Sequence, residues 1–209
     1  MARCMKSMQI IGADEEGVVR KALLVLRAGG AVVYPTDTLY ALGCDATNTE
    51  AIRRVFEIKR RPFEKPLPIA VASIQMMRRY CELEEKAEKL ARAFLPGALT
   101  LLLRKKNLPD ILTSGSPKVA VRIPANELAL RITAALGKPV VATSANISGR
   151  PPPVSAQEAT AQLREVELVI DAGRLAEERI PSTIYDPEED RIIRQGRIDR
   201  ARIEAVLRE

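Results

Sequence analysis

The chain has 209 residues with an ordinary globular composition, 46% hydrophobic and 29% charged, and a formal net charge of +6. It contains no histidine and no tryptophan, which excludes Ser–His and Cys–His catalysis and leaves little material for stacking nucleic-acid bases. Cys4, Cys44 and Cys81 are far apart, so we expect neither a disulfide framework nor a metal ligated by the protein. No apolar run approaches about 18 residues and no signal segment is apparent, so we expect a cytoplasmic protein that does not associate with a membrane.

Strand and helix patterns alternate along the chain, which predicts one α/β domain over residues 1–209. Apolar spacing and capping residues predict helices at residues 14–28, near 49–59, and at 73–80, 83–94, 126–136, 155–163 and after 199. Short apolar runs predict strands at residues 31–34, 67–72, 98–103, 118–123, 140–142, 167–171, 182–185 and 191–194. Asn126 and Asp199 are expected N-caps, and Gly137 is an expected C-cap.

A cationic loop follows the second of these helices. The segment KRRPFEKPL, residues 59–67, carries four cations within seven residues, and its two prolines keep it out of helix and strand. Such a loop at the junction of two elements can hold phosphate oxygens. A solvated basic turn explains the same pattern about as well.

Three polar loops follow or neighbour apolar strands, at residues 36–40, 144–149 and 182–183. In open α/β sheets ligands collect beyond the carboxyl ends of the strands, so these loops and the cations Lys59, Arg61 and Arg122 indicate an anion site. No base–nucleophile pair is evident. Phosphoryl-type transfer therefore fits best, because it requires positioning and charge neutralisation rather than an enzyme nucleophile.

The order of these motifs resembles that of the YrdC family, also called TsaC. PTDTLYALG at residues 35–43 is similar to the family's PT(D/E)TxYxLG segment, while residues 59–67 and SANISG at 144–149 match its KxR…SxN signature. Four further segments follow in family order: PGALT at 96–100, VRIP at 121–124, PSTI at 181–184 and RQG at 194–196. The resemblance covers the chain from about residue 17 to its end.

The resemblance implies a twisted mixed β-sheet flanked by helices around a basic concave cavity. It also implies L-threonylcarbamoyladenylate synthesis, in which threonine, bicarbonate and ATP give threonylcarbamoyl-AMP and pyrophosphate. That product supplies the t6A modification of tRNA through a downstream threonylcarbamoyl-transferase of the TsaD or KEOPS type. tRNA itself is a candidate direct partner.

The same resemblance assigns roles to individual residues. Lys59, Arg61, Ser144 and Asn146 are expected to be catalytic and, with Arg194, to bind ATP together with Mg²⁺. Thr36, Tyr40, Arg122 and Ser182 are expected to frame threonine, with Arg122 as the partner of its carboxylate. The alternatives are a surface ion pair for Arg122 and a helix cap for Ser144.

One departure from the family pattern concerns the strand after the cationic loop. Family members often have a histidine in the sequence PL-x-x-H, whereas residues 68–72 here read PIAVA. A related branch, YciO-like, tends to lack the SxN element, so Ser144 and Asn146 favour the synthase. Two other functions stay open: a non-catalytic protein that binds structured RNA, and a carbamoyl-transferring relative of the hydrogenase-maturation type.

Overall fold

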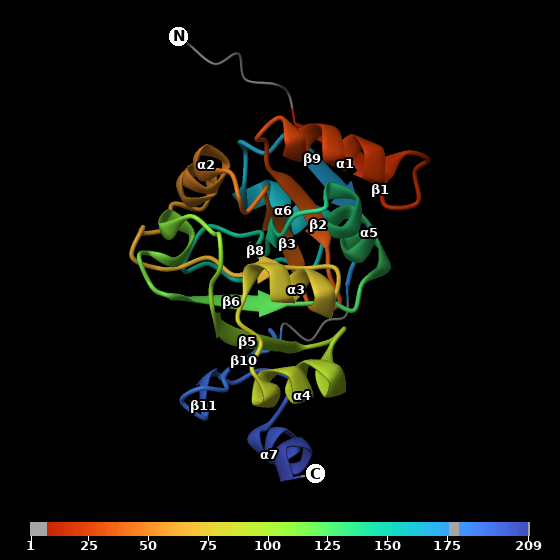
Figure 1. Ribbon diagram of the computed structural model, residues 1–209. Helices are drawn as coiled ribbons and strands as arrows, with labels where there is room; N and C mark the ends of the chain where they lie inside the picture. Colours follow the sequence, from red (N-terminus) through yellow and green to blue (C-terminus); the bar gives the residue numbers. More distant parts are fainter. Residues whose placement is uncertain (1–7, 176–179, 209) are drawn as a thin grey trace.

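The computed structural model describes residues 8–175 and 180–208, and its strands form two mixed sheets (Figure 1). The first sheet has the order β1-β9-β2-β3-β8, with β1 Gln9–Gly12, β9 Leu168–Asp171, β2 Val32–Pro35, β3 Tyr40–Gly43 and β8 Thr143–Ser144. The second has the order β11-β10-β5-β6-β4-β7, with β11 Arg191–Arg194, β10 Thr183–Asp186, β5 Leu99–Arg104, β6 Lys118–Arg122, β4 Ile69–Ala70 and β7 Val140–Val141. The expected mixed α/β fold is confirmed, although two sheets replace the single sheet.

The helices cover the outer sides of this pair of sheets (Figure 1). They are α1 Val18–Arg27, α2 Thr49–Lys59, α3 Ile74–Tyr80, α4 Glu85–Phe94, α5 Glu127–Leu136, α6 Ala156–Gln162 and α7 Arg200–Arg208, with a 3₁₀ turn at Asp110–Thr113. Apolar side chains of α1 and α5 pack with those of β2 and β9 on the first sheet. The larger apolar core joins the two sheets, with Val33 and Leu42 from the first and Leu101 and Val121 from the second. This shared core fixes how the two sheets face each other.

Capping residues set the ends of several helices as expected. The side chain of Asn126 accepts a hydrogen bond from the Ala129 N–H at 3.0 Å, and that of Asp199 accepts one from the Arg202 N–H at 2.9 Å. Gly137 ends α5 in the left-handed conformation, with φ 73°. These predicted caps are therefore confirmed.

The first helix is shorter than predicted. It begins at Val18 rather than near residue 14, directly after Gly17, which adopts φ 76°. A left-handed residue cannot continue a right-handed helix, so residues 13–17 form turns before the helix starts.

The chain crosses from one sheet to the other between Val141 and Thr143. β7 pairs with β4 in the second sheet, whereas β8 pairs with β3 in the first. Between them, the Ala142 N–H donates to the Pro68 carbonyl oxygen at 2.9 Å. The prediction of one strand over residues 140–142 is therefore wrong in extent. The crossing places Ser144, the last residue of β8, where the two sheets meet.

Candidate active site

A cavity of about 100 Å³ opens where the two sheets meet. β3 and β8 of the first sheet contribute lining residues, as do β4, β5, β6, β10 and β11 of the second. Of the residues expected in the site, the structure brings together Thr36, Tyr40, Arg122, Ser144, Ser182 and Arg194 as lining residues. Lys59, Arg61 and Asn146 are not among the residues that line the cavity.

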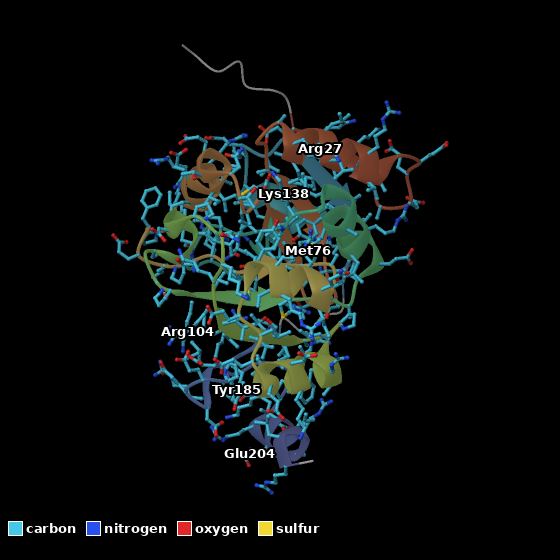
Figure 2. All side chains as sticks on the ribbon, in the orientation of Figure 1. Arg27, Met76, Arg104, Lys138, Tyr185 and Glu204 are labelled. Carbon is cyan, nitrogen blue, oxygen red and sulfur yellow. The ribbon has the colours of Figure 1, made fainter. Side chains whose placement is uncertain are left out.

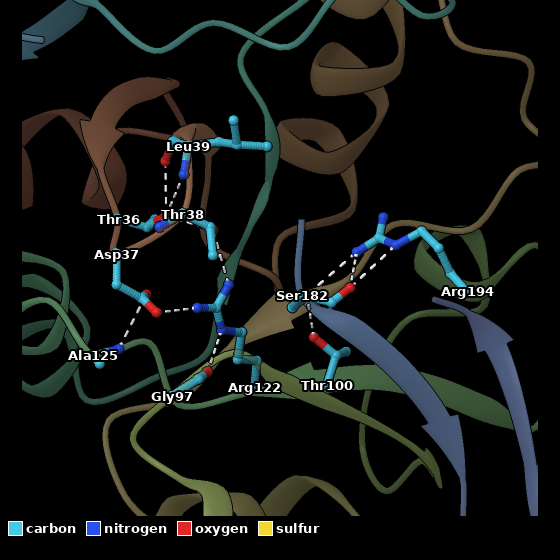
Figure 3. A network of polar contacts seen from close by, with 10 residues as sticks. All are labelled: Thr36, Asp37, Thr38, Leu39, Gly97, Thr100, Arg122, Ala125, Ser182 and Arg194. Atoms are coloured by element: carbon cyan, nitrogen blue, oxygen red, sulfur yellow. Dashed lines mark hydrogen bonds and ion pairs between the residues drawn. The ribbon is translucent and has the colours of Figure 1, made fainter. Parts of the chain in front are cut away.

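Arg122, the last residue of β6, is held by three acceptors (Figure 3). Its Nε donates to the Gly97 carbonyl oxygen at 2.7 Å, Nη1 to Thr38 Oγ1 at 3.1 Å, and Nη2 to Asp37 Oδ2 at 2.5 Å. A guanidinium has five N–H donors, so two of them, one on each terminal nitrogen, have no partner among residues 8–175 and 180–208. The arginine is thus rigidly placed and can still bind an anion. The ion pair considered from the sequence exists, but it lies in the cavity wall rather than on the surface.

Ser182 lies between Arg194 and Thr100 on the other side of the cavity (Figure 3). Arg194 donates from Nε and Nη2 to the Ser182 carbonyl oxygen at 3.2 and 2.8 Å, and Nη2 also lies 3.2 Å from Ser182 Oγ. The Ser182 and Thr100 hydroxyl oxygens lie 2.8 Å apart. These contacts use one edge of the Arg194 guanidinium and leave Nη1 for a ligand.

Arg122 and Arg194 place two positive charges on one cavity. Burial lowers the pKa of Arg122, although the nearby Asp37 carboxylate acts in the opposite direction. Burial also lowers the pKa of Arg194, and the charge of Arg122 lowers it further. Arg104, which is labelled in Figure 2, instead lies on the surface and pairs with Glu188 at 2.5 Å. Two like charges that face each other across a partly desolvated space favour an anion between them.

Thr36 shapes the cavity wall through its own loop. Its Oγ1 donates to the Leu39 carbonyl oxygen at 2.7 Å and accepts from the N–H groups of Thr38 and Leu39, both at 3.2 Å. These bonds form a tight turn between β2 and β3. The hydroxyl of Thr36 is therefore committed to the loop, and its main contribution is to place Thr38 beside Arg122.

Tyr40 contributes its ring to the wall, because its hydroxyl is bound elsewhere. The hydroxyl donates to the Gly173 carbonyl oxygen at 2.6 Å and accepts from the Ala172 N–H at 2.9 Å. Burial, with a smaller effect of the Asp171 carboxylate, raises the pKa of Tyr40 to about 12. The phenol is thus neutral at physiological pH and anchors the segment after β9.

Lys59 is buried behind the cavity. Its ammonium donates to the main-chain carbonyl oxygens of Ser144 and Asn146, the latter at 2.7 Å, and the residue is 1% exposed. Burial and the nearby charge of Arg61 lower its pKa from 10.5 to about 7. The lysine therefore supports the segment that carries Ser144, and two of its three N–H groups are already used.

Arg61 is bound within its own loop. Nε donates to the Lys65 carbonyl oxygen and Nη2 to that of Pro66, both at 2.9 Å, and burial lowers its pKa. Arg60, between the two, has φ 48° and lines a separate hollow with Arg150 and Arg164. The change of backbone direction at Arg60 thus separates its side chain from that of Lys59.

Asn146 has one polar atom to spare. Its Nδ2 donates to the carbonyl oxygens of Ile147 at 3.0 Å and Arg150 at 2.6 Å. Two carbonyl partners identify this atom as nitrogen, because an oxygen there would be repelled. Oδ1 is buried and has no hydrogen-bond partner among the described residues, as is also true of Ser148 Oγ. The side chain can therefore accept a further bond but offers a phosphate no free donor.

The position of the family histidine is taken by an apolar wall. Pro68, Ile69 and Ala70 line the cavity beside Arg122. This wall provides surface for a methyl group and no proton donor.

Asp37 and Thr38 lie in the loop 36–40 that the sequence predicts at the anion site, although neither has an individual predicted role, and Thr100 is not among the predicted site residues. Asp37 and Thr38 lie inside the PTDTLYALG segment, and Thr100 ends the PGALT segment, so the motifs contained the signal. Contacts with Arg122 and Ser182, distant in sequence, give them their place in the site.

Among residues 8–175 and 180–208, no group of three or more Cys, Asp or Glu side chains is placed to hold a metal ion. None of the helices described there combines the length and apolar character needed to cross a lipid bilayer.

Comparison with known families gives a match over most of the chain. The model named for Sua5, YciO and YrdC, and described as Telomere recombination, matches residues 24–196. The chain is also 40% identical over 202 residues to a threonylcarbamoyl-AMP synthase of Pyrococcus abyssi. This alignment covers 93% of this chain and 58% of the relative. It is 36% identical over 197 residues to that of Bacillus subtilis, with 90% and 56% covered. The chain thus spans somewhat more than half the length of these relatives.

Solved structures give the same result for the fold. A crystal structure of P. abyssi Sua5 complexed with L-threonine is similar with a TM-score of 0.90 and 38% identity, covering 95% of this chain and 61% of that chain. The crystal structure of E. coli YciO is similar with a TM-score of 0.82 and 28% identity, covering 93% and 98%.

Proposed function

Because the chain belongs to the Sua5, YciO and YrdC family, we propose that it is an L-threonylcarbamoyladenylate synthase. It would join threonine, bicarbonate and ATP and release pyrophosphate. The observation that carries this proposal is the pair Arg122 and Arg194, which face one cavity from two strands with guanidinium donors still unused. Relatives that share about two-fifths of its residues are named threonylcarbamoyl-AMP synthase, and a Sua5 structure carries L-threonine.

The chemistry asks little of the protein beyond positioning. The threonine amine condenses with bicarbonate to form a carbamate, with loss of one water. A carbamate oxygen then attacks the α-phosphate of ATP, with pyrophosphate as the leaving group. Neither bond formation requires an enzyme nucleophile, which suits a chain without histidine. What the reaction needs is two anionic substrates held together and the developing charge stabilised.

Arg122 is the natural partner of the threonine carboxylate. Its two unused N–H groups lie on neighbouring nitrogens, and a guanidinium binds a carboxylate with two parallel hydrogen bonds. Thr36, Tyr40 and the apolar wall of Pro68, Ile69 and Ala70 enclose the side of the cavity that would receive the threonine side chain. Ser182 completes this subsite from the opposite wall.

Arg194 and Ser144 are the cavity residues that we assign to ATP. Within the described part of the chain Arg194 Nη1 has no hydrogen-bond partner, and Ser144 presents its side chain at the junction of the sheets. Lys59 supports Ser144 from behind and retains one N–H for a phosphate oxygen. Arg61 adds positive charge near Lys59.

Mg²⁺ fits this site as a companion of ATP. The described residues place no carboxylate cluster here, so the phosphates themselves would supply most of its ligands. The buried Oδ1 of Asn146, which like Ser148 Oγ has no hydrogen-bond partner among the described residues, would accept from a water of that ion. Asn146 would then act at the metal side of the triphosphate.

The remaining expectations follow from the product. Threonylcarbamoyl-AMP would pass in the cytoplasm to a threonylcarbamoyl-transferase of the TsaD or KEOPS type, which modifies tRNA. tRNA is also proposed to contact this chain directly. The net charge of +6 favours binding to any polyanion and does not select tRNA.

The test is a pyrophosphate-release assay with ATP, bicarbonate and each of the twenty amino acids. We expect release to require threonine and bicarbonate together. Serine should react more slowly, because packing one methyl group gives about 1–3 kcal/mol of discrimination. Release without an amino acid would contradict the proposal, and dependence on carbamoyl phosphate would indicate the carbamoyl-transferring alternative. A protein that only binds RNA would release no pyrophosphate and would lose affinity steeply with salt.

A further inference from the structure

Asp37 occupies a position between the two sheets. It lies in the loop between β2 and β3 of the first sheet, whereas Arg122 ends β6 of the second. Its Oδ2 accepts from Arg122 Nη2 at 2.5 Å, and its Oδ1 accepts from the Ala125 N–H at 3.1 Å (Figure 3). One carboxylate thus fixes both the side chain of Arg122 and the backbone that follows it.

The contacts of Arg122 leave few ways for the guanidinium to turn. Its Nε is bound to Gly97, and Nη1 and Nη2 are bound to Thr38 and Asp37, so each of its three nitrogens has one fixed partner. The side chain of Asp37 is 17% exposed and that of Arg122 is 12% exposed. A partly desolvated ion pair of this kind holds its geometry more firmly than an exposed one.

We propose that Asp37 is a positioning residue that aims the two unused N–H groups of Arg122 at the carboxylate of the amino-acid substrate. This inference rests on the proposed function, since it takes the amino acid as the ligand of Arg122. It goes further in making the affinity for the amino acid, rather than for ATP, depend on a carboxylate that does not itself touch substrate.

A competing role would have the opposite effect. Asp37 carries the same charge as the substrate carboxylate, so it could weaken binding by competing for Arg122. Removing its charge would then tighten the binding of threonine. The positioning role predicts weaker binding, because an Arg122 that has lost one of its three anchors spends part of its time in other orientations.

The variant Asp37→Asn separates these roles. The amide keeps an oxygen for the Ala125 N–H but loses the charge that holds Arg122 Nη2. We expect the KM for threonine to rise by about tenfold or more, as for a lost charge-assisted hydrogen bond, with the KM for ATP changed less than about twofold. The matched control is Asp45→Asn. This variant breaks the ion pair of 2.9 Å between Asp45 and Lys138 (labelled in Figure 2), and neither residue lines the cavity.

Threonine binding by calorimetry, which needs no turnover, gives a second measurement. In an Arg122→Lys background the further change Asp37→Asn should alter the threonine Kd by less than about twofold. If Asp37 acts only through the guanidinium of Arg122, its replacement has little further effect once that guanidinium is gone, so the effects of the two substitutions do not add. An unchanged or lower threonine KM in Asp37→Asn, or equal rises for threonine and ATP, would overturn the inference. Absence of threonine-dependent release by the unaltered protein would instead count against the proposed function.

Discussion

The ammonium of Lys59 lies 2.7 Å from the main-chain carbonyl oxygen of Asn146, a residue 87 positions further along the chain. The same ammonium also donates to the Ser144 carbonyl oxygen. A buried lysine with two of its three donors bound to the backbone first supports that backbone. It therefore differs from an exposed phosphate-binding lysine, and this difference can be measured.

Replacing Lys59 should lower stability as well as activity. Lys59→Ala removes the ammonium that donates to the carbonyl oxygens of Ser144 and Asn146, of which the Ser144 oxygen still accepts from the Asn146 N–H at 2.9 Å. We expect this loss to cost about 1–3 kcal/mol in the free energy of unfolding. Arg60→Ala is the control: Arg60 is exposed, and its loss should change stability by about 0.5 kcal/mol or less. Urea denaturation of the two variants gives the comparison. Equal stability of Lys59→Ala and the unaltered protein would mean that other donors replace the ammonium.

The lowered pKa of Lys59 predicts a pH dependence of stability. Its pKa is 10.5 in the unfolded chain and about 7 in the folded protein, so between these values the unfolded state binds more protons. Stability from this group is therefore fully present above pH 10.5 and is lost as the pH falls towards 7. The free energy of unfolding, relative to Lys59→Met, should rise from pH 7 to 9 by up to about 1.4 kcal/mol per pH unit. Parallel curves for the two proteins would refute this assignment.

Arg194 and Arg191 offer a matched pair on one strand. Arg194 lines the cavity, whereas Arg191 is exposed and pairs with Glu189 at 2.8 Å. If Arg194 stabilises charge that develops on the phosphates, Arg194→Ala should lower kcat by about 10²-fold. Arg191→Ala should change it by less than about twofold, and far-UV circular dichroism would verify the fold of both. Similar losses in the two variants would indicate a diffuse positive surface instead.

The buried thiols should be unreactive. Burial raises the pKa of Cys44, and it raises that of Cys81 to about 12, so neither thiol is ionised at neutral pH. In a Cys4→Ser background we expect no modification by iodoacetamide at pH 7.5 in the native state and two modifications in denaturant. Mass spectrometry provides the count. Rapid native labelling with loss of activity would show that one of these thiols is accessible and functional.

The sequence determined those features that depend on neighbours along the chain. Asn126 and Asp199 begin their helices because a cap bonds to N–H groups only three residues away. The motifs identified the family and most of the cavity wall, because Thr36, Arg122, Ser144 and Ser182 lie at or next to the ends of strands that come together in the fold.

Tertiary structure decided what each polar atom is free to do. The crossing between β7 and β8 brings Ser144 and Asn146 within reach of Lys59, so two of the three donors of this lysine bind the backbone and one is left for a phosphate oxygen. The pairing of Asp37 with Arg122 likewise depends on how two sheets pack, across 85 positions of sequence. Each N–H donor binds about one acceptor, so a donor that is bound to the protein is no longer available to a ligand. The free donors of a site are therefore known only once every distant partner is in place.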